Sequence, residues 1–222
     1  MDKPIRYVIY DMDGLLLDTE PFYTQASQII AGRFGKVFDW SVKSKMIGRR
    51  ANDSARALVE TLELPITPED YLRERESILE HLFPMAEPLP GAVQLTMHLH
   101  RNGIPQAVAT SSDRHHFELK TSRHREWFGI FEALVKGDDP AVKHGKPAPD
   151  MFLVAAERLK ANPADCLVFE DAPSGTEAAI AAGMQVIAIP DPNMDRAVYR
   201  GAAQILASLE EFNPRLWGLP AY

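Results

Sequence analysis

Two aspartates, Asp11 and Asp13, stand one residue apart near the start of the 222-residue chain. They follow the short apolar run from Ile5 to Tyr10, which predicts a buried strand. In an open α/β sheet, ligands bind where the strands end. Two carboxylates this close repel each other unless a pKa rises or a cation binds, and Mg²⁺ is commonly held by one or two carboxylates together with a substrate phosphate. The pair therefore predicts a magnesium site that takes a further ligand from elsewhere in the chain.

Two later apolar runs also end in polar side chains. The run from Gln106 to Ala109 is followed by Thr110-Ser111, and the run from Cys166 to Phe169 is followed by Glu170-Asp171. Parallel strands end at one edge of their sheet, so we expect these side chains to lie near the acidic pair. Hydroxyl groups and backbone N–H groups hold phosphate oxygens, and carboxylates from two strands share a Mg²⁺.

Lys146 adds a positive charge on the loop Gly145-Lys146-Pro147. Each of these motifs alone has an ordinary structural explanation. Asp-x-Asp-Gly is common in turns, hydroxyl and acidic residues cap helices, and a lone lysine is usually solvated. Their occurrence in this order at the ends of three strands predicts a nucleophile, a metal site and a phosphate-binding site.

The elements that must position these residues differ along the chain. Between residues 18 and 87 the apolar spacing is helical and predicts no strand. We expect helices over Pro21–Gly35, from a cap at Asn52 or Asp53, and from Thr67 to Leu82. The domain boundaries predicted from this change are a core of residues 1–17 and 88–222 and a helical insertion of residues 18–87.

From Pro90 onward, predicted helices alternate with predicted strands, a pattern typical of a parallel sheet with crossover helices. The fold class predicted is α/β, with a Rossmann-like core and a small inserted α-helical cap. The expected helices are Ala92–Asn102, Arg114–Arg123, Asp150–Leu159 and Ser174–Ala182, and the expected strands that follow the first are Gln106–Ala109, Phe131–Val135, Cys166–Phe169 and Gln185–Ile189.

Composition narrows the range of partners. The formal net charge of -7 argues against binding to a nucleic-acid backbone. Cys166 is the single cysteine, which excludes an intramolecular disulfide, and its apolar run favours a buried thiol over a reactive one. The apolar run near the N-terminus is too short for a signal peptide or a membrane span. We therefore expect a cytoplasmic protein with no membrane partner, and we expect a monomer.

Together the motifs resemble the haloacid dehalogenase-like phosphatases, in the branch with a helical cap after the first strand. The resemblance is carried by Asp11-x-Asp13-Gly14-x-x-x-Asp18, Thr110, Lys146-Pro147 and Glu170-Asp171, and it covers nearly the whole chain. It implies a Mg²⁺-dependent phosphomonoester hydrolase that forms an aspartyl phosphate on a small phosphorylated metabolite. Finer similarities, in Lys120–His124 and in the tail at Trp217–Pro220, imply pseudouridine 5′-phosphate or a similar nucleotide or sugar phosphate as substrate.

The resemblance also implies roles for single residues. Asp11 would be the nucleophile, and Asp13 would protonate the leaving group and then activate water. Thr110 and Lys146 would hold the transferring phosphoryl group. The remaining implied roles are Mg²⁺ binding, by Asp11, the Asp13 carbonyl, Glu170 and Asp171, and substrate binding, by Met12, Gly14 and Ser111.

Substrate choice is expected to depend on the cap, where Arg49 follows Gly48 in a predicted loop. His115 and His116 are more consistent with solvated residues at a helix start than with substrate contacts, and the segment Thr121–Arg125 is a second candidate for a substrate-facing surface. Two alternatives stay open. A sugar phosphomutase related to β-phosphoglucomutase would share all four motifs, and a non-catalytic member would only bind a phosphorylated ligand.

Overall fold

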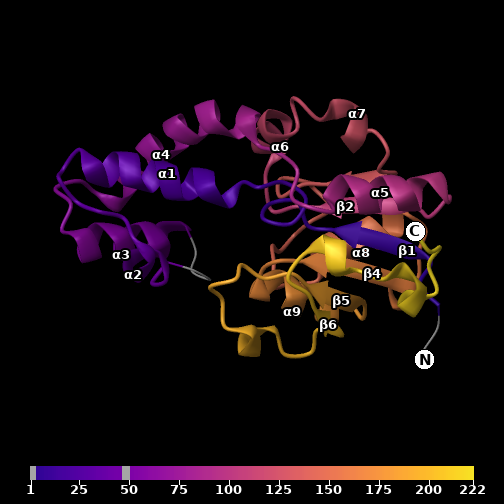
Figure 1. Cartoon of the computed structure of the whole chain (residues 1–222). Helices are drawn as coiled ribbons and strands as arrows, with labels where there is room; N and C mark the ends of the chain where they lie inside the picture. The colour runs from indigo at the N-terminus through magenta and orange to yellow at the C-terminus, as the bar shows by residue number, and fades with distance from the viewer. Residues whose placement is uncertain (1–3, 47–50) are drawn as a thin grey trace. The chain divides into compact units, whose positions relative to one another are not determined.

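The computed structural model describes residues 4–46 and 51–222 (Figure 1). The chain divides into two compact units. The first combines Met1–Asp18 with Glu87–Tyr222, and the second is Thr19–Ala86.

The first unit is built on a six-stranded sheet in the order β3-β2-β1-β4-β5-β6, and every neighbouring pair is parallel. The predicted Rossmann-like parallel sheet is confirmed. β1, which precedes the acidic pair, lies in the interior of the sheet between β2 and β4. The strands are β1 Tyr7–Tyr10, β2 Gln106–Ala109, β3 Ala133–Val135, β4 Cys166–Glu170, β5 Gln185–Ala188 and β6 Gln204–Ile205.

The strands are short and apolar because the interior ones are covered on both faces. All residues of β2 and β4 are buried. One core is formed by α8 and α9 packed on strand residues such as Ile9, Val168 and Val186. The helices of this unit are α5 Ala92–Arg101, α6 Arg114–Lys120, α7 Arg125–Phe128, α8 Asp150–Arg158 and α9 Pro173–Ala181, with short 3₁₀ helices at Pro163–Asp165, Arg196–Tyr199, Leu209–Glu211 and Pro214–Trp217.

Among its described residues, the second unit contains helices joined by turns and no strand, as the spacing predicts. It contains α1 Glu20–Gly32, α2 Trp40–Lys43, α3 Ala51–Leu62, α4 Pro68–Leu82 and the 3₁₀ helix Phe83–Met85. Its core includes Ile30, Leu58 and Tyr71, and the Tyr71 hydroxyl lies 2.8 Å from the hydroxyl of Ser27.

The helix starts of this unit agree only in part with the sequence. Thr67 caps α4 as predicted, since its hydroxyl accepts a hydrogen bond from the Asp70 N–H at 3.0 Å. The predicted cap of α3 at Asn52 or Asp53 is wrong. α3 begins at Ala51, so both residues lie inside the first helical turn, where Asp53 instead places a negative charge near the helix start.

The two chain segments that lead out of and back into the first unit are hydrogen bonded to each other. The Asp18 N–H donates to the Glu87 carbonyl at 2.9 Å, and the Leu89 N–H donates to the Leu16 carbonyl at 3.0 Å. These bonds fix the backbone that follows the acidic pair. The loop is thus held as part of the sheet-containing unit.

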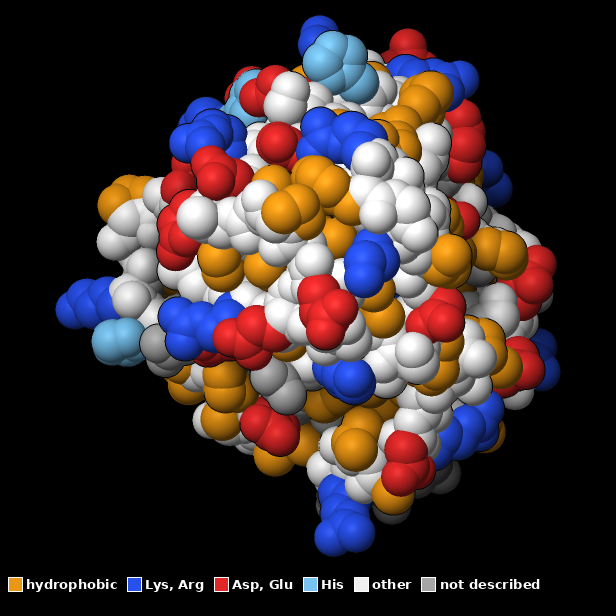
Figure 2. Space-filling view, turned by 90° about the vertical axis from the view of Figure 1, so that its left-hand side faces the viewer, with side chains coloured by type: hydrophobic (Ala, Val, Ile, Leu, Met, Phe, Trp, Pro, Cys, Tyr) orange, Lys and Arg blue, Asp and Glu red, His pale blue; other side chains and the backbone are white. Residues whose placement is uncertain are grey.

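Among the residues described, no helix combines the length and the apolar character that crossing a membrane requires. On the face drawn in Figure 2, lysine and arginine side chains are intermixed with aspartate and glutamate.

Candidate active site

The acidic loop leaves β1 through a tight, glycine-dependent turn. The Asp11 N–H still donates to the Phe169 carbonyl at 3.0 Å, so this residue is aligned with β4. Gly14 has a φ of 76°, a conformation that other residues rarely adopt. Its N–H donates to the Leu17 carbonyl at 2.9 Å, and the Met12 carbonyl accepts from the Leu16 and Leu17 N–H groups. The turn therefore sets the direction in which the two aspartates leave the strand.

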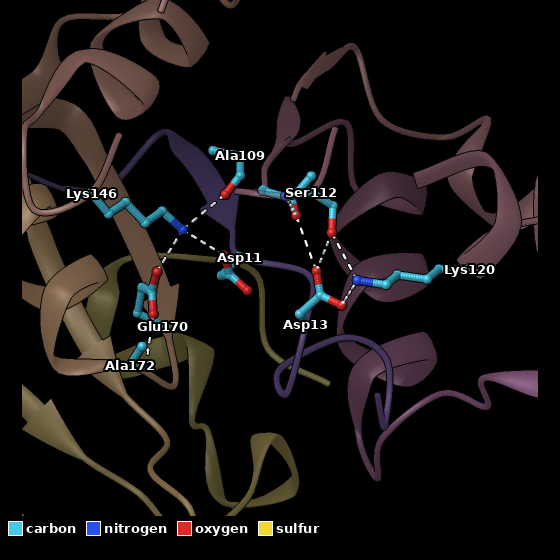
Figure 3. Close-up of polar contacts among 9 residues, drawn as sticks. Asp11, Asp13, Ala109, Ser112, Lys120, Lys146, Glu170 and Ala172 are labelled. Carbon is cyan, nitrogen blue, oxygen red and sulfur yellow. Dashed lines mark hydrogen bonds and ion pairs between the residues drawn. The ribbon is translucent and has the colours of Figure 1, made fainter. Parts of the chain in front are cut away.

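Lys146 joins Asp11 to the end of β4. Its Nζ lies 2.5 Å from Oδ1 of Asp11 and 2.7 Å from Oε1 of Glu170, and it also donates to the Ala109 carbonyl at 3.1 Å. All three ionisable side chains are at least nine-tenths buried. Figure 3 shows the lysine reaching both carboxylates from one side.

The charges of this group shift each other's pKa. Burial, together with the nearby Glu170 and Asp13 carboxylates, raises the pKa of Asp11 to about 7, although Lys146 acts in the opposite direction. Burial alone would lower the pKa of Lys146, but the carboxylates of Asp11 and Glu170 raise it above its ordinary value. The lysine is therefore charged at neutral pH, and the aspartate lies in a site that favours further positive charge.

Glu170 is held by its own strand end and by the helix that follows. Its second oxygen, Oε2, accepts from the Ala172 N–H at 2.8 Å. Gly175, in the first turn of α9, leaves the space that this carboxylate fills. A Cβ at residue 175 would lie 1.6 Å from Oε1 of Glu170. Only glycine accommodates the observed position of the glutamate.

Asp11, Glu170 and Asp171 form a group that fits a divalent cation. One carboxylate oxygen from each lies within 4.8 Å of the others. Three hard oxygen ligands are suited to Mg²⁺, and three carboxylates carry more negative charge than Lys146 alone offsets. The Asp171 carbonyl accepts a hydrogen bond from the Tyr199 hydroxyl at 2.5 Å, which fixes the backbone beside this group. The residues present thus fit the metal that the sequence predicts.

Asp13 faces a different set of partners. Oδ1 accepts from Nζ of Lys120 at 2.6 Å, whereas Oδ2 accepts from the hydroxyl of Ser112 at 2.8 Å and from that of Thr110 at 3.2 Å. Figure 3 shows the two aspartates directed to opposite sides, Asp11 toward Lys146 and Asp13 toward Lys120. The acidic pair is thereby divided between two lysines.

Three of the sequence-predicted strand ends therefore meet, as parallel pairing requires. The predicted residues Asp11, Lys146 and Glu170 are joined by ion pairs, Thr110 is hydrogen bonded to Asp13, and Asp171 completes the carboxylate group. The roles assigned to them stay predictions. Arg49 lies outside the described residues.

Two residues of this network were missed by the sequence analysis. Ser112, not Ser111, donates to Asp13, and Lys120 reaches it from the last residue of α6. The α6 pattern offered a signal, because Lys120 falls three residues after the buried Phe117 and so lies on the inner face of the helix.

The loop that carries Ser111 and Ser112 is positioned by a neighbouring glycine turn. The Gly137 N–H donates to the Ser112 carbonyl at 2.8 Å, and a Cβ at Gly137 would lie 2.2 Å from the Ser111 carbonyl oxygen. Asp138 then accepts from the Arg114 N–H at 3.1 Å, at the start of α6. The sequence Gly137-Asp138 thus supports the Asp13 side of the site.

The remaining segments that the sequence singled out have local structural roles. His115 is exposed, and His116 lies beside Asp113, which caps α6. The Thr121 hydroxyl donates to the Phe117 carbonyl at 2.7 Å, and Arg123 pairs with Glu87 at 2.9 Å. Much of the Thr121–Arg125 segment is thus engaged within its own unit.

Comparison with known proteins agrees with this geometry. The model of the haloacid dehalogenase-like hydrolase family matches residues 5–183. The (DL)-glycerol-3-phosphatase 2 of Arabidopsis thaliana is 53% identical over 98% of this chain and 93% of its own length. A Drosophila melanogaster protein named "Probable pseudouridine-5'-phosphatase" is 45% identical over 99% of this chain and 96% of its own.

A solved structure also matches over the whole chain. A haloacid dehalogenase family hydrolase from Deinococcus radiodurans, with bound phosphate and sodium, has a TM-score of 0.81 at 26% identity, and the match covers 100% of both chains. The sheet order, the divided acidic pair and these matches lead to one conclusion: the chain belongs to the haloacid dehalogenase-like hydrolase family.

Proposed function

We propose that the chain is a phosphatase that hydrolyses monoesters of small phosphorylated metabolites through a covalent phosphoryl group on Asp11. The observation that supports this most directly is the contact of one buried lysine, Lys146, with Asp11 and Glu170 at the ends of neighbouring strands. A positive charge there stabilises the phosphoryl oxygens, and it also favours the ionised form of the nucleophile.

In the first step, a carboxylate oxygen of Asp11 attacks phosphorus and the bond from phosphorus to the ester oxygen breaks. Asp13, protonated, gives its proton to the departing oxygen, so an alcohol leaves and an aspartyl phosphate remains. In the second step, Asp13 accepts a proton from water as the water oxygen attacks phosphorus. Inorganic phosphate then leaves and both aspartates are regenerated.

Other groups would bind the transferring phosphoryl group without exchanging protons. Lys146 would contact its oxygens, together with the backbone N–H groups of Met12 and Asp13, and the Thr110 hydroxyl, which donates to Oδ2 of Asp13 at 3.2 Å in this structure, would rotate to join them. We give the Gly14 N–H no such contact, because it already donates to the Leu17 carbonyl. Ser111, exposed on the adjacent loop, would bind the substrate beside them.

Mg²⁺ would be held by Asp11, the Asp13 carbonyl, Glu170 and Asp171. When bound, the ion offsets the negative charge that nucleophile and phosphate bring together. The group of three carboxylates supports this assignment.

Two substrates are favoured by the relatives. The Arabidopsis protein acts, by its name, on glycerol 3-phosphate, and the Drosophila protein on pseudouridine 5′-phosphate. We propose that this chain takes a small phosphate monoester, either a nucleotide or sugar phosphate such as pseudouridine 5′-phosphate or a polyol phosphate. We assign the choice to the helical second unit as a cap, with Arg49 as a substrate-binding residue.

The test is a screen of pseudouridine, uridine, hexose and glycerol phosphates with Mg²⁺, ranked by kcat/KM. We expect one substrate to exceed the others by at least about tenfold, which is about 1.4 kcal/mol of discrimination. Asp11→Asn should abolish turnover with the melting temperature unchanged, whereas Glu157→Gln, which neutralises an exposed carboxylate on α8, should leave kcat unchanged. Near-normal hydrolysis by the Asp11 variant would refute the mechanism.

The same assay separates hydrolysis from phosphoryl transfer between two sugar hydroxyls. A hydrolase releases free phosphate without a bisphosphate activator. Conversion of one sugar phosphate into an isomer, with no phosphate released, would establish the mutase alternative instead.

A further inference from the structure

Lys120 is a buried lysine to which the reaction outlined above gives no part. Its side chain is 1% exposed, and it extends from the end of α6 to Asp13. Nζ lies 2.6 Å from Oδ1 of Asp13 and 2.8 Å from the hydroxyl of Ser112. Removing an ammonium group from water is costly, so its presence here calls for a role that an apolar side chain of the same length would not fill.

We propose that Lys120 is a positioning residue for Asp13: through its ion pair and through Ser112 it fixes the carboxyl that exchanges the proton with the leaving group. This inference rests on the proposed function. It adds a residue that the four family motifs do not contain.

The geometry supports this role because both oxygens of the Asp13 carboxylate are engaged. Lys120 binds Oδ1, and the hydroxyls of Ser112 and Thr110 bind Oδ2. Lys120 also donates to the hydroxyl that in turn donates to Oδ2, so lysine, serine and carboxylate form a closed ring of hydrogen bonds (Figure 3). A carboxylate held at both oxygens has little rotational freedom, which is what a proton donor that acts at one defined atom requires.

The surrounding structure holds Lys120 itself in place. Phe117, one turn earlier on α6, is buried and packs edge-on against Phe128 of α7, with ring centroids 5.6 Å apart. At the other end of α6, the Asp113 side chain accepts from the His116 N–H at 2.8 Å. The helix is thus anchored at its start and along its inner face, so the lysine is held rigidly.

The role predicts a dependence on the leaving group. An alkyl phosphate releases a poor leaving group that needs a proton from Asp13, whereas p-nitrophenyl phosphate releases a stable anion that does not. The ratio kcat/KM reports the steps up to formation of the aspartyl phosphate, so it isolates the first proton transfer. Replacing a residue that acts through Asp13 should therefore lower kcat/KM more for the alkyl phosphate than for p-nitrophenyl phosphate.

The experiment compares Lys120→Met with the wild-type protein on p-nitrophenyl phosphate and on the sugar or polyol phosphate that the wild type hydrolyses best. We expect kcat/KM for the alkyl ester to fall about 10²-fold, the lower range for a misplaced general acid, and that for the aryl ester to fall less than about threefold. In an Asp13→Asn background, adding Lys120→Met should lower the aryl ester activity by less than about twofold, because the residue through which it acts is gone.

Lys136→Met is the matched control. Lys136 also contacts α6, with Nζ 4.8 Å from the centre of the Phe117 ring, and no hydrogen bond joins its ammonium group to Asp13 in the described residues. The Lys136→Met substitution should leave the ratio of kcat/KM for the alkyl ester to that for the aryl ester as in the wild type. If Lys120→Met does not fold, Ser112→Ala replaces it and should lower the alkyl ester activity selectively, by a smaller factor.

Equal losses on both substrates, an unchanged alkyl ester activity, or a further loss in the Asp13→Asn background would overturn the inference. A wild-type protein that hydrolyses neither ester would instead refute the proposed function. The two failures are therefore distinguishable.

Discussion

Lys120 and Lys146 neutralise different members of the acidic pair: one Nζ lies 2.6 Å from Asp13 and the other 2.5 Å from Asp11. They come from separate segments, the end of α6 and the loop before α8. Because each aspartate has its own cation, the two residues can be tested independently.

Lys146→Met should lower kcat/KM for aryl and alkyl phosphates by the same factor, about 10² or more, because the charge that stabilises the phosphoryl group is lost whichever group leaves. The measurement is the same pair of steady-state assays with Mg²⁺. A selective loss on the alkyl ester would contradict this assignment and would give Lys146 the part that we propose for Lys120.

Gly175→Ala should lower both stability and activity. In a helix, alanine is ordinarily more favourable than glycine by about 1 kcal/mol, but here its Cβ would collide with Oε1 of Glu170. We expect a lower melting temperature and at least about a tenfold loss of kcat. Displacement of the Glu170 charge needs to cost only about 1.36 kcal/mol of transition-state stabilisation to lower kcat by that factor.

Gly32→Ala is the control for this substitution. Gly32 lies in the last turn of α1, and a Cβ there would meet only the Gln28 side chain at an ordinary 3.5 Å. The melting temperature of the Gly32→Ala protein should equal or exceed that of the wild type. A Gly175→Ala protein that behaves in the same way would show that Glu170 can move without consequence.

Removal of the metal should abolish hydrolysis, and Mg²⁺ should restore it. Mg²⁺ that binds the folded state alone should also raise the melting temperature, with a stabilisation of about 2.7 kcal/mol at a hundredfold excess over Kd. In Asp171→Asn this shift should be much smaller.

Asp165→Asn serves as the control for the metal experiment, because Asp165 precedes β4 whereas Asp171 follows it. The thermal shift with Mg²⁺ should stay as in the wild type. An equal shift in all three proteins would mean that the ion binds away from the group of Asp11, Glu170 and Asp171.

Cys166 should be unreactive in the folded protein. It is buried in β4, and burial, with the nearby Asp165, raises its pKa to about 12. At pH 8 the native thiol should resist iodoacetamide, whereas the unfolded chain, with an ordinary thiol pKa of about 8.5, should be alkylated within minutes. Mass spectrometry with and without denaturant measures both, and rapid labelling of the native protein would contradict the buried assignment.

Much of the fold could be predicted because the signals were local. Apolar runs with clear ends gave β2 at Gln106–Ala109 and located β1, β4 and β5 to within two residues. The strand ends then placed Asp11 near Glu170 and Thr110 beside Asp13, since parallel strands must end at one edge. The starts of helices were predicted less accurately, because a capping side chain is recognised only once the backbone is known. At α3, for example, the predicted caps Asn52 and Asp53 both lie inside the helix.

The Asp13 side of the site could not be predicted, because it depends on side-chain direction. Ser111 and Ser112 are adjacent hydroxyls, and only the turn fixed by Gly137 decides which one faces Asp13. The spacing from Phe117 places Lys120 on the inner face of a short helix, but its contact with Asp13 depends on the packing of Phe117 against Phe128. Such contacts join segments distant in sequence, which local patterns do not record.

The interior position of β1 has a consequence for how the protein is made. The strand is synthesised before both of its neighbours, because Val8 pairs with Gln106 and Tyr7 with Cys166, so its two edges find their partners only after β2 and β4 have been made. The helices of Thr19–Ala86 make contacts that are close in sequence and can form earlier. During synthesis the apolar strand before Asp11 therefore stays without its sheet partners until they have been made, and unpaired apolar strands of this kind promote aggregation.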